Sequence, residues 1–333
     1  MRSRSEGAFA PNADAARWRA DALHDPSRDW PQTNCYVDLW IEAIHARGLP
    51  AQAMLGFTAR LDFEGDQFTF FKPPLEDIEA LYGFVTRELS LYDDVEGHIV
   101  EQCAQGRLVM IETDAFFLPD TRGVSYRTEQ SKTTVGVNRI DPVAKTIDYF
   151  HNDGFFRLSG EDYDGAVAFG ADLGRQKLPP YAEIVKPDFA PPGECETRGL
   201  ARALLHAHIE RRPTRNPVSI FAERLPSLVA RAAAREPAFF HKFAFNTMRQ
   251  LGANFELMAS HLDWLGEAQE FTQASEHCRA ISAGAKAFQF LLARAIMRGK
   301  SAGLDAPLAA LADRYEALFT LLARNGGALR RAG

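Results

Sequence analysis

Cysteine is scarce in this sequence of 333 residues, which contains only four. A disulfide scaffold needs closely spaced cysteines, and a zinc site needs cysteine or histidine pairs separated by roughly two to five residues. The four positions here are far apart along the chain: Cys35, Cys103, Cys195 and Cys278. The chain is therefore expected to be neither a disulfide-stabilised scaffold nor a zinc finger.

Long apolar runs are also missing. No segment approaches the roughly 18 uninterrupted apolar residues typical of a membrane helix. The opening MRSRSEGAFAPNADAARW has no apolar signal-peptide core. The P-loop, the GxGxxG fingerprint and the GxSxG motif are absent as well. We therefore expect a cytoplasmic protein without a membrane segment.

Charge divides the chain into two parts. Residues 1–195 carry 19 Lys and Arg against 32 Asp and Glu, a net of −13, whereas residues 196–333 carry 19 against 12, a net of +7. This asymmetry predicts two bodies, and the basic one would attract an anionic partner. Alternatively, the second part is simply a helical region rich in arginine and alanine. The pI of about 5.9 and the lack of long basic runs disfavour nucleic acid as the partner.

Hydrophobic spacing predicts the α+β fold class, with an α+β domain followed by an all-α helical domain. We expect a flexible N-terminus over residues 1–28, the α+β domain over 29–173, a linker over 174–193 and the helical domain over 194–333. The linker prediction depends on five prolines between positions 174 and 193. The helical prediction depends on the 3–4 spacing of apolar residues after it.

Within the α+β domain, helices are expected over residues 33–50, 74–82 and 93–105. Strands are expected over 107–113, 132–140 and 145–152, with a further hairpin about a turn at residues 64–66. The sequence DPVA at positions 141–144 is typical of a turn and would pair the last two long strands antiparallel. In that register His151 would lie opposite Thr134, at the open end of the hairpin.

Cys35 lies in the first turn of the first expected helix. Free amide N–H groups and the helix dipole stabilise a thiolate there, which is the nucleophilic form of cysteine. The same amides can donate to the oxyanion formed during acyl transfer. Cys35 is thus a candidate nucleophile; the alternative is a small buried apolar residue.

A cysteine nucleophile needs a base and a group that orients the base. His151 ends a strand, beside Asn152 and close to Asp148. It would share one strand face with Ile147 and Tyr149, while Asp148 and Asn152 would point to the other side. The alternative is a polar turn at the end of a strand.

The segment DFEGDQFTFFKPP combines acidic and aromatic residues. It could form the wall of a pocket or an ordinary hairpin packed on a core. Asp62, Glu64 and Asp66 alternate as calcium ligands do, but the other ligand positions are missing. No metal site is predicted.

Several segments resemble an uncharacterised bacterial domain family whose members accompany carrier proteins and amino acid:carrier-protein ligases. The resemblance spans roughly residues 30–265 and is carried by NCYVDLWIE, DFEGDQFTFFKPPLEDIEALYG, FFLPDT, KTTVGV and YFHNDGFFRL. More remotely, Cys35 and the order of elements resemble the butirosin-biosynthesis-H type of aminoacyltransferase. The resemblance implies a papain-like cysteine domain with an antiparallel sheet, similar to the peptidase domains of bacteriocin exporters.

The resemblance also implies a reaction. An acyl or aminoacyl group would pass from the phosphopantetheine thiol of a carrier protein to Cys35, and then to a small acceptor. In papain-like enzymes the base opens the strand that here reads KTTVGV, where this chain has no histidine. The third catalytic member ends the next strand, where His151 stands. His151 is therefore the candidate base, with Asn152 or Asp148 as the orienting residue.

Further residues are assigned to the oxyanion site, the substrate pocket and partner docking. Those of the oxyanion site and pocket are Asn34, Gln32, Gln130, Lys132, Thr133, Asp66 and Phe71. Those expected to dock an acidic carrier protein are Arg211, Arg212 and Arg215. The only cofactor implied is the partner's phosphopantetheine, and a homodimer is left open.

Two other functions fit the same residues. A thioesterase or peptidase would use the same cysteine and pass the acyl group to water. A papain-like shell without its usual histidine would instead bind a partner or small molecule without catalysis, and its Cys35 would be an ordinary unreactive thiol.

Overall fold

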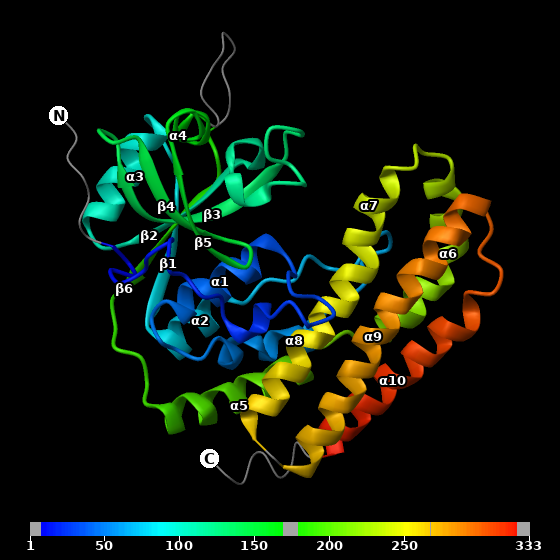
Figure 1. The fold of residues 1–333 in the computed structure, drawn as a ribbon. Helices are drawn as coiled ribbons and strands as arrows, with labels where there is room; N and C mark the ends of the chain where they lie inside the picture. Colours follow the sequence, from blue (N-terminus) through cyan, green and yellow to red (C-terminus); the bar gives the residue numbers. More distant parts are fainter. Residues whose placement is uncertain (1–7, 169–178, 267, 325–333) are drawn as a thin grey trace. The chain divides into compact units, whose positions relative to one another are not determined.

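The computed structural model describes residues 8–168, 179–266 and 268–324, and the chain forms two compact units (Figure 1). Unit 1 comprises residues 1–25, 35–51 and 78–192. Unit 2 comprises residues 26–34, 52–77 and 193–333. Each unit is therefore assembled from three separate stretches of chain.

Unit 1 is built around a six-stranded antiparallel sheet with the strand order β1-β6-β2-β3-β4-β5 (Figure 1). The strands are β1 (Phe84–Leu89), β2 (Leu108–Asp114), β3 (Lys132–Asp141), β4 (Thr146–His151), β5 (Gly154–Ser159) and β6 (Ala182–Pro187). The turn between β3 and β4 lies at residues 142–145, one residue later than the expected 141–144. Asp141, the last residue of β3, accepts hydrogen bonds from the amides of Val143 and Ala144 through its carboxylate.

One face of the sheet is covered by α1 (Cys35–His45), a helix whose middle is buried on all sides. Leu39 of α1 packs on Gly136 of β3, where an added Cβ would lie 3.2 Å from a Leu39 methyl carbon. Glycine thus lets the helix approach the strand closely. Trp18 extends this layer, since its ring packs on Phe150 of β4 while its indole N–H donates to Glu42 of α1.

The other face of the sheet is covered by α3 (Val95–Ala104) and α4 (Glu161–Val167). The apolar core on this side includes Cys103 of α3, Val135 of β3, Tyr149 of β4 and Tyr163 of α4. The alternation of β4 agrees with the sequence prediction. Ile147 and Tyr149 share this core, and Asp148 faces away from it to bind arginines.

The register of the β3–β4 hairpin differs from the prediction by two residues next to the turn, where Ile140 pairs with Ile147, and by one residue farther away, where Gly136 pairs with Phe150. The offset begins at the turn, because Asp141 already pairs with Thr146. The irregularity between Val137 and Arg139 then changes the offset by one residue, which a count from the turn cannot foresee.

The N-terminal segment differs from the flexible tail predicted over residues 1–28. Residues 8–25 pack into unit 1, with Phe9 and Leu23 fully buried. The amide of Asn138 donates to the carbonyl of Ala10 and its oxygen accepts from the amide of Ala10. Residues 26–28 belong to unit 2, where Arg28 donates to the Ser260 hydroxyl. Residues 1–7 lie outside the described residues.

The proline-rich segment predicted as a linker over 174–193 contains β6, which pairs with both β1 and β2. Its five prolines lie before the strand, at the last residue of the strand and after it, where a missing amide donor is tolerated. Positions 174–178 lie outside the described residues. The sequence also gave no sign of β1, β5 or α4. In the hairpin expected about residues 64–66, the only pairing is an isolated bridge between Phe63 and Phe68.

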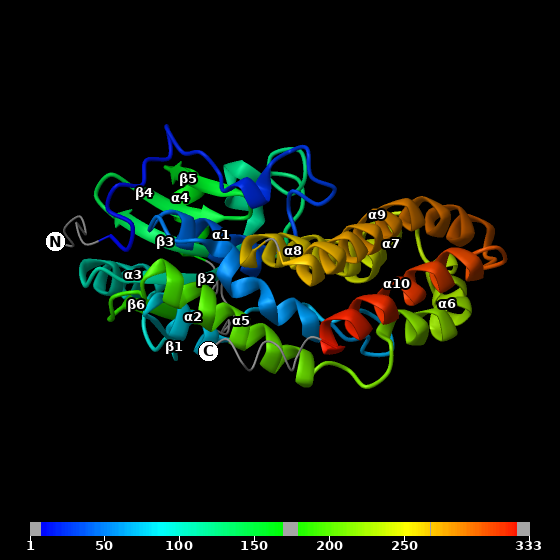
Figure 2. The same cartoon turned by 90° about the horizontal axis from the view of Figure 1, so that it is seen from below.

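Unit 2 begins with short stretches, the 3₁₀ helix η2 (Ala51–Arg60) and the start of α2 (Leu75–Tyr82), and continues as a set of helices. The helices are α5 (Glu194–Glu210), α6 (Pro217–Ala233), α7 (Phe239–Ala244), α8 (Gln250–Leu265), α9 (Gln269–Arg298) and α10 (Asp305–Arg324), with a π-helical turn, η5 (Phe245–Arg249), between α7 and α8. Figure 2 shows α9 running beside α8 and α10. This α-helical region agrees with the sequence prediction; residues 325–333 lie outside the described part.

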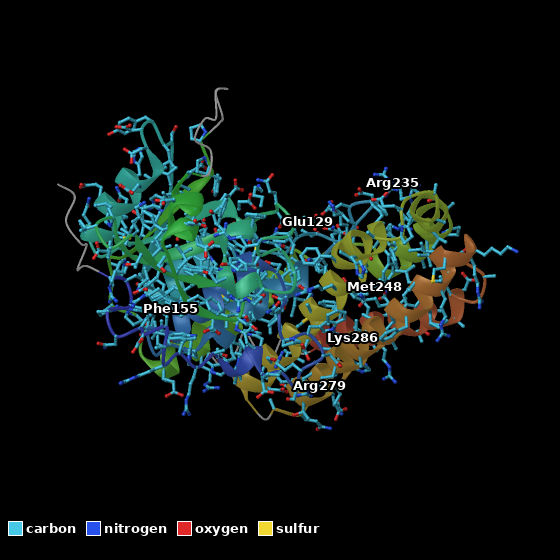
Figure 3. All side chains as sticks on the ribbon, turned by 45° about the horizontal axis from the view of Figure 1, so that its top comes forward. Glu129, Phe155, Arg235, Met248, Arg279 and Lys286 are labelled. Carbon is cyan, nitrogen blue, oxygen red and sulfur yellow. The ribbon has the colours of Figure 1, made fainter. Side chains whose placement is uncertain are left out.

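The segment 26–34 is anchored within unit 2. Lys286, labelled in Figure 3, belongs to α9. It donates to the carbonyl of Asp29, and its ammonium lies 4.3 Å from the centre of the Trp30 ring. Trp30 also rests on Gly252 of α8, where a Cβ would be 2.5 Å from the indole. These contacts make residues 26–34 an integral part of the helical unit.

Among the described helices, α9 is the one long and apolar enough to cross a membrane by composition alone. It buries Phe271, Ile281 and Leu292 in the unit. Within unit 2 it packs on α8 and α10.

Candidate functional site

The end of β4 places His151 in a buried network with Asp120 and Thr133. The Nδ1 atom of His151 is 2.5 Å from Oδ2 of Asp120, and its Nε2 atom is 2.8 Å from the Thr133 hydroxyl oxygen. The His151 side chain is only 1% exposed. The three groups form a carboxylate–imidazole–hydroxyl relay, which is the chemical order of an Asp–His–Ser triad.

Asp120 is positioned by a short 3₁₀ turn, η4 (Pro119–Thr121). Leu118, just before the turn, is fully buried, and the Thr121 hydroxyl donates to the carbonyls of Ala115 and Leu118. These anchors hold the Asp120 carboxylate against His151. The sequence predicted no element between the strands over 107–113 and 132–140, and the sole signal for Asp120 was its place in the segment FFLPDT.

Tyr149 supplies a second donor to Asp120. Its hydroxyl donates to Oδ1, the oxygen that His151 does not use. Burial, and then the negative charge of Asp120, raise the pKa of Tyr149 well above its usual value of 10. Tyr149 is thus held as a neutral donor, and Asp120 is held as an acceptor of two hydrogen bonds.

The hydrogen bonds fix the tautomer of a neutral His151. Because Nδ1 carries the proton donated to Asp120, Nε2 has a free lone pair. The Thr133 hydroxyl then donates to Nε2. Thr133 is half-buried at the second position of β3, so it is the member of the relay that reaches the surface. The arrangement can move a proton from a surface hydroxyl to a buried base.

A cleft of about 510 Å³ borders the relay at its carboxylate end. Its lining includes Asp120 and Phe156, with Asp14, Arg122 and Arg157 around them. Arg157 is already bound to Asp148 through two hydrogen bonds. Asp120 is therefore the member of the relay that lines this cleft.

The structure does not bring Cys35 to His151, which corrects the predicted catalytic pair. Cys35 is the half-buried first residue of α1, as expected, and has no hydrogen-bond partner among the described residues. However, Gly136 and Phe150 face α1, so His151, the next residue along β4, points to the opposite face of the sheet. Both nitrogens of His151 are also already bonded.

Neither predicted orienting residue contacts the His151 ring. Asp148 accepts hydrogen bonds from Arg139 and Arg157 on the other face of β4. Asn152 begins the two-residue turn between His151 and Gly154, at a φ of 45° that asparagine tolerates. Asp120 takes the orienting role instead.

The other site residues predicted in unit 1 have separate surroundings. Lys132 is exposed and pairs with Glu112 at 2.5 Å. Gln130 is exposed in the loop before β3. Thr133, assigned by sequence to substrate binding, is instead bonded directly to His151.

Of the four site residues predicted in unit 2, two belong to a pocket or its support and two lie elsewhere. The Asn34 amide donates to the carbonyl of Phe71 at 3.0 Å, and Phe71 lines a pocket. The carbonyl of Gln32 accepts from Arg249, and Asp66 is exposed at the tip of its turn. None of these residues is part of the relay.

Two of the three arginines predicted to dock a carrier protein already contact other residues of unit 2. Arg212 lies over the ring of Phe319, and Arg215 pairs with Glu223 at 2.7 Å. Arg211, at the end of α5, is exposed.

Two of the other three cysteines, Cys103 and Cys278, are deeply buried. Burial raises the pKa of Cys103 to about 12 and raises that of Cys278 well above its usual value. No group of three or more His, Cys, Asp or Glu in the described part of the chain is arranged to hold a metal ion.

Two family models match the chain. The DUF1839 N-terminal domain matches residues 19–187, and the DUF1839 C-terminal domain matches residues 194–324. A search among curated proteins finds no match. The matches agree with the expectation of an uncharacterised domain family.

Proposed function

The chain belongs to the DUF1839 family, and we propose that it is an acyltransferase whose nucleophile is the hydroxyl of Thr133. The acyl or aminoacyl group comes from a carrier-protein thioester and goes to a small acceptor. The observation that carries the proposal is the hydrogen-bonded relay from Asp120 through His151 to Thr133. The reaction class is the one expected from the sequence, but the nucleophile moves from Cys35 to Thr133.

In the first half-reaction, Nε2 of His151 takes the Thr133 hydroxyl proton as the oxygen attacks the thioester carbonyl carbon. Collapse of the tetrahedral intermediate breaks the C–S bond, and the leaving sulfur takes the proton from His151. The products are an acyl ester on Thr133 and a free phosphopantetheine thiol. Asp120 stabilises the imidazolium that forms in between.

In the second half-reaction, an amine of the acceptor attacks the Thr133 ester and loses a proton to His151. The C–O bond breaks, and the Thr133 oxygen recovers that proton. The product is an amide, and the relay returns to its starting state. Tyr149 keeps Asp120 fixed during both proton transfers by occupying its second oxygen.

A papain-like origin for unit 1 and a cytoplasmic location are parts of this proposal. Two features support the papain-like origin. A helix that begins with Cys35 precedes the antiparallel strands, and His151 ends the strand on which papain-like enzymes have their third catalytic residue. An acidic carrier would use the net positive charge of residues 196–333, where Arg211 is exposed.

The test is to trap the ester. The protein is incubated with a panel of acyl- and aminoacyl-pantetheine thioesters, and its peptides are mapped by mass spectrometry. We expect the acyl mass on the peptide that contains Thr133, loss of that mass in Thr133→Val, and its retention in Thr133→Ser. Thr134→Val is the matched control, because it makes the same change at the next position of β3.

Two alternatives give different results. A hydrolase would release free acid at the same rate without an amine acceptor. A non-catalytic binding protein, which the deep burial of His151 favours, would form no ester with any thioester. Thr133→Val would then lower only the free energy of unfolding, by about 1 kcal/mol for a lost hydrogen bond.

A further inference from the structure

A second pocket lies within unit 2 and is unrelated to the relay. It has a volume of about 290 Å³ and is lined by residues of η2 and of the segment 69–74. This volume lies just below the roughly 300–1,000 Å³ of most small-molecule sites. A ligand of metabolite size would fit it.

The walls of the pocket combine polar and apolar surface and are fixed in place. Phe57, Leu61 and Phe71 are all buried, and the rings of Phe57 and Phe71 lie 6.3 Å apart. The amide of Asn34 holds the carbonyl of Phe71 at 3.0 Å. The Thr69 hydroxyl is tied to the opposite arm of its turn through the Asp62 carbonyl. The pocket is thus formed before any ligand arrives, which lowers the entropy lost on binding.

The lining residues include two cationic side chains, Arg60 and Lys72, and no aspartate or glutamate. Arg60 is exposed and has no hydrogen bond or ion pair within the described parts of the chain. Lys72 is also exposed, with its ammonium 6.0 Å from the centre of the Phe70 ring. The nearby carboxylate of Glu64 is bonded to the Thr69 hydroxyl. The lining therefore favours an anion.

Phe70 adds an exposed apolar surface at the same place. Its side chain is 38% exposed and lies under Lys72. An aromatic ring beside a cation can contact both the apolar part and the charged part of one ligand. This combination is typical of sites that take amphiphiles.

We propose that this pocket binds a small amphiphile with an apolar chain and a single anionic head, such as a medium-chain carboxylate. The chain packs against the exposed ring of Phe70 and the small parts of Phe57, Leu61 and Phe71 that line the pocket, and the head is placed between Arg60 and Lys72. This site is independent of the acyl-transfer proposal, because all its residues belong to unit 2 and none belongs to the relay.

Isothermal titration calorimetry of the full-length protein with octanoate and with octanol tests the proposal. We expect octanoate to bind more tightly than octanol, because only octanoate has the anionic head. Arg60→Gln and Lys72→Gln should each weaken octanoate binding about fivefold and leave octanol binding unchanged, as expected for one partly exposed charge pair. Arg224→Gln, at an exposed position of α6, is the control.

Phe70→Ala separates the apolar contribution from the charge. It should weaken octanoate and octanol by the same factor. The proposal is overturned if octanoate does not bind, if it binds no more tightly than octanol, or if Arg224→Gln weakens it as much as Arg60→Gln does. Circular dichroism of each variant confirms that it is folded.

Discussion

The Nδ1 atom of His151 lies 2.5 Å from Oδ2 of Asp120, although 31 residues separate the two along the chain. The pair is buried, and each partner has a further hydrogen bond: Asp120 accepts from Tyr149, and His151 bonds to Thr133. When His151 takes a proton from Thr133, the positive charge on the ring is therefore compensated by the fixed negative charge of Asp120 on its far side. The carboxylate of Asp120 should therefore be needed for acyl transfer.

Asp120→Asn should abolish acyl transfer while the protein stays folded. The amide lacks the charge that stabilises the imidazolium and can force His151 into the wrong tautomer. We expect the rate of Thr133 acylation to fall by about 10²–10⁴-fold, the usual share of a general base and its orienting group. Asp164→Asn, an exposed aspartate of α4 that pairs with Lys145, is the control. A rate within twofold of wild type would remove Asp120 from the mechanism.

The reactivity of Cys35 should not depend on His151. The two residues lie on opposite faces of the sheet, so His151→Ala leaves the surroundings of the thiol unchanged. The measurement is the rate of iodoacetamide labelling of Cys35 between pH 6 and 9, read by peptide mapping.

Exposed Cys195 serves as an internal reference in that experiment, and buried Cys103 and Cys278 should label only after unfolding. Slower labelling of Cys35 in His151→Ala would restore the cysteine–histidine pair as the reactive centre.

His24 should make unit 1 sensitive to alkaline pH. Its Nδ1 lies 2.5 Å from Glu42, and its Nε2 lies 3.4 Å from Asp38. Burial alone would lower the pKa of His24, but hydrogen bonds to these carboxylates and their charges outweigh it and raise the pKa from 6.5 to about 10. The folded state therefore binds a proton more tightly than the unfolded state does.

This stabilisation is fully present below about pH 6.5 and is lost as the pH rises through about 10. In urea unfolding, wild-type protein should lose a few kcal/mol between pH 6.5 and 10.5, at about 1.4 kcal/mol per pKa unit. His24→Gln should be less stable at pH 6.5 and show a much flatter profile. His98→Gln, a half-buried histidine of α3, should follow wild type. Equal slopes in His24→Gln and wild type would refute the buried imidazolium.

His261 should make unit 2 sensitive to acid instead. It is fully buried on α8, where its ring bonds to the carbonyl of Gln52 at 2.8 Å. Burial lowers the pKa of His261 from 6.5 to about 4. The unfolded state then binds the proton more tightly, so stability is fully present above pH 6.5 and is lost as the pH falls toward 4.

The measurement is the urea midpoint of the helical signal at pH 7.5 and at pH 5. His261→Asn, which keeps a donor for Gln52, should lower the midpoint at pH 7.5 and narrow the difference between the two pH values. The matched control is His241→Asn, an exposed position on α7. A difference in His261→Asn as large as in wild type would assign the acid sensitivity to other groups.

Local patterns were sufficient for some features and insufficient for others. Alternation along β4 correctly placed Tyr149 with Ile147 and set Asp148 apart, because side-chain direction in a strand is set by the residue's own position. The start of α1 at Cys35 could likewise be predicted from the local sequence. The face of the sheet that α1 covers could not be predicted in this way, because it depends on the packing of Leu39 on Gly136.

Asp120 and β6 were missed for a related reason. Asp120 reaches His151 through a 3₁₀ turn that buried Leu118 fixes, and no periodic pattern marks such a turn. β6 has only six residues among several prolines, so its composition favoured a linker. Pairing with β1 and β2 overrides that local preference.

The chain passes between unit 1 and unit 2 five times, at residues 25–26, 34–35, 51–52, 77–78 and 192–193. A cut at the last passage would leave residues 26–34 and 52–77 without the helices of their own unit, and those helices without Trp30. No single cut in the chain can therefore separate unit 1 from unit 2. A cut between the two family matches, 19–187 and 194–324, would divide unit 2.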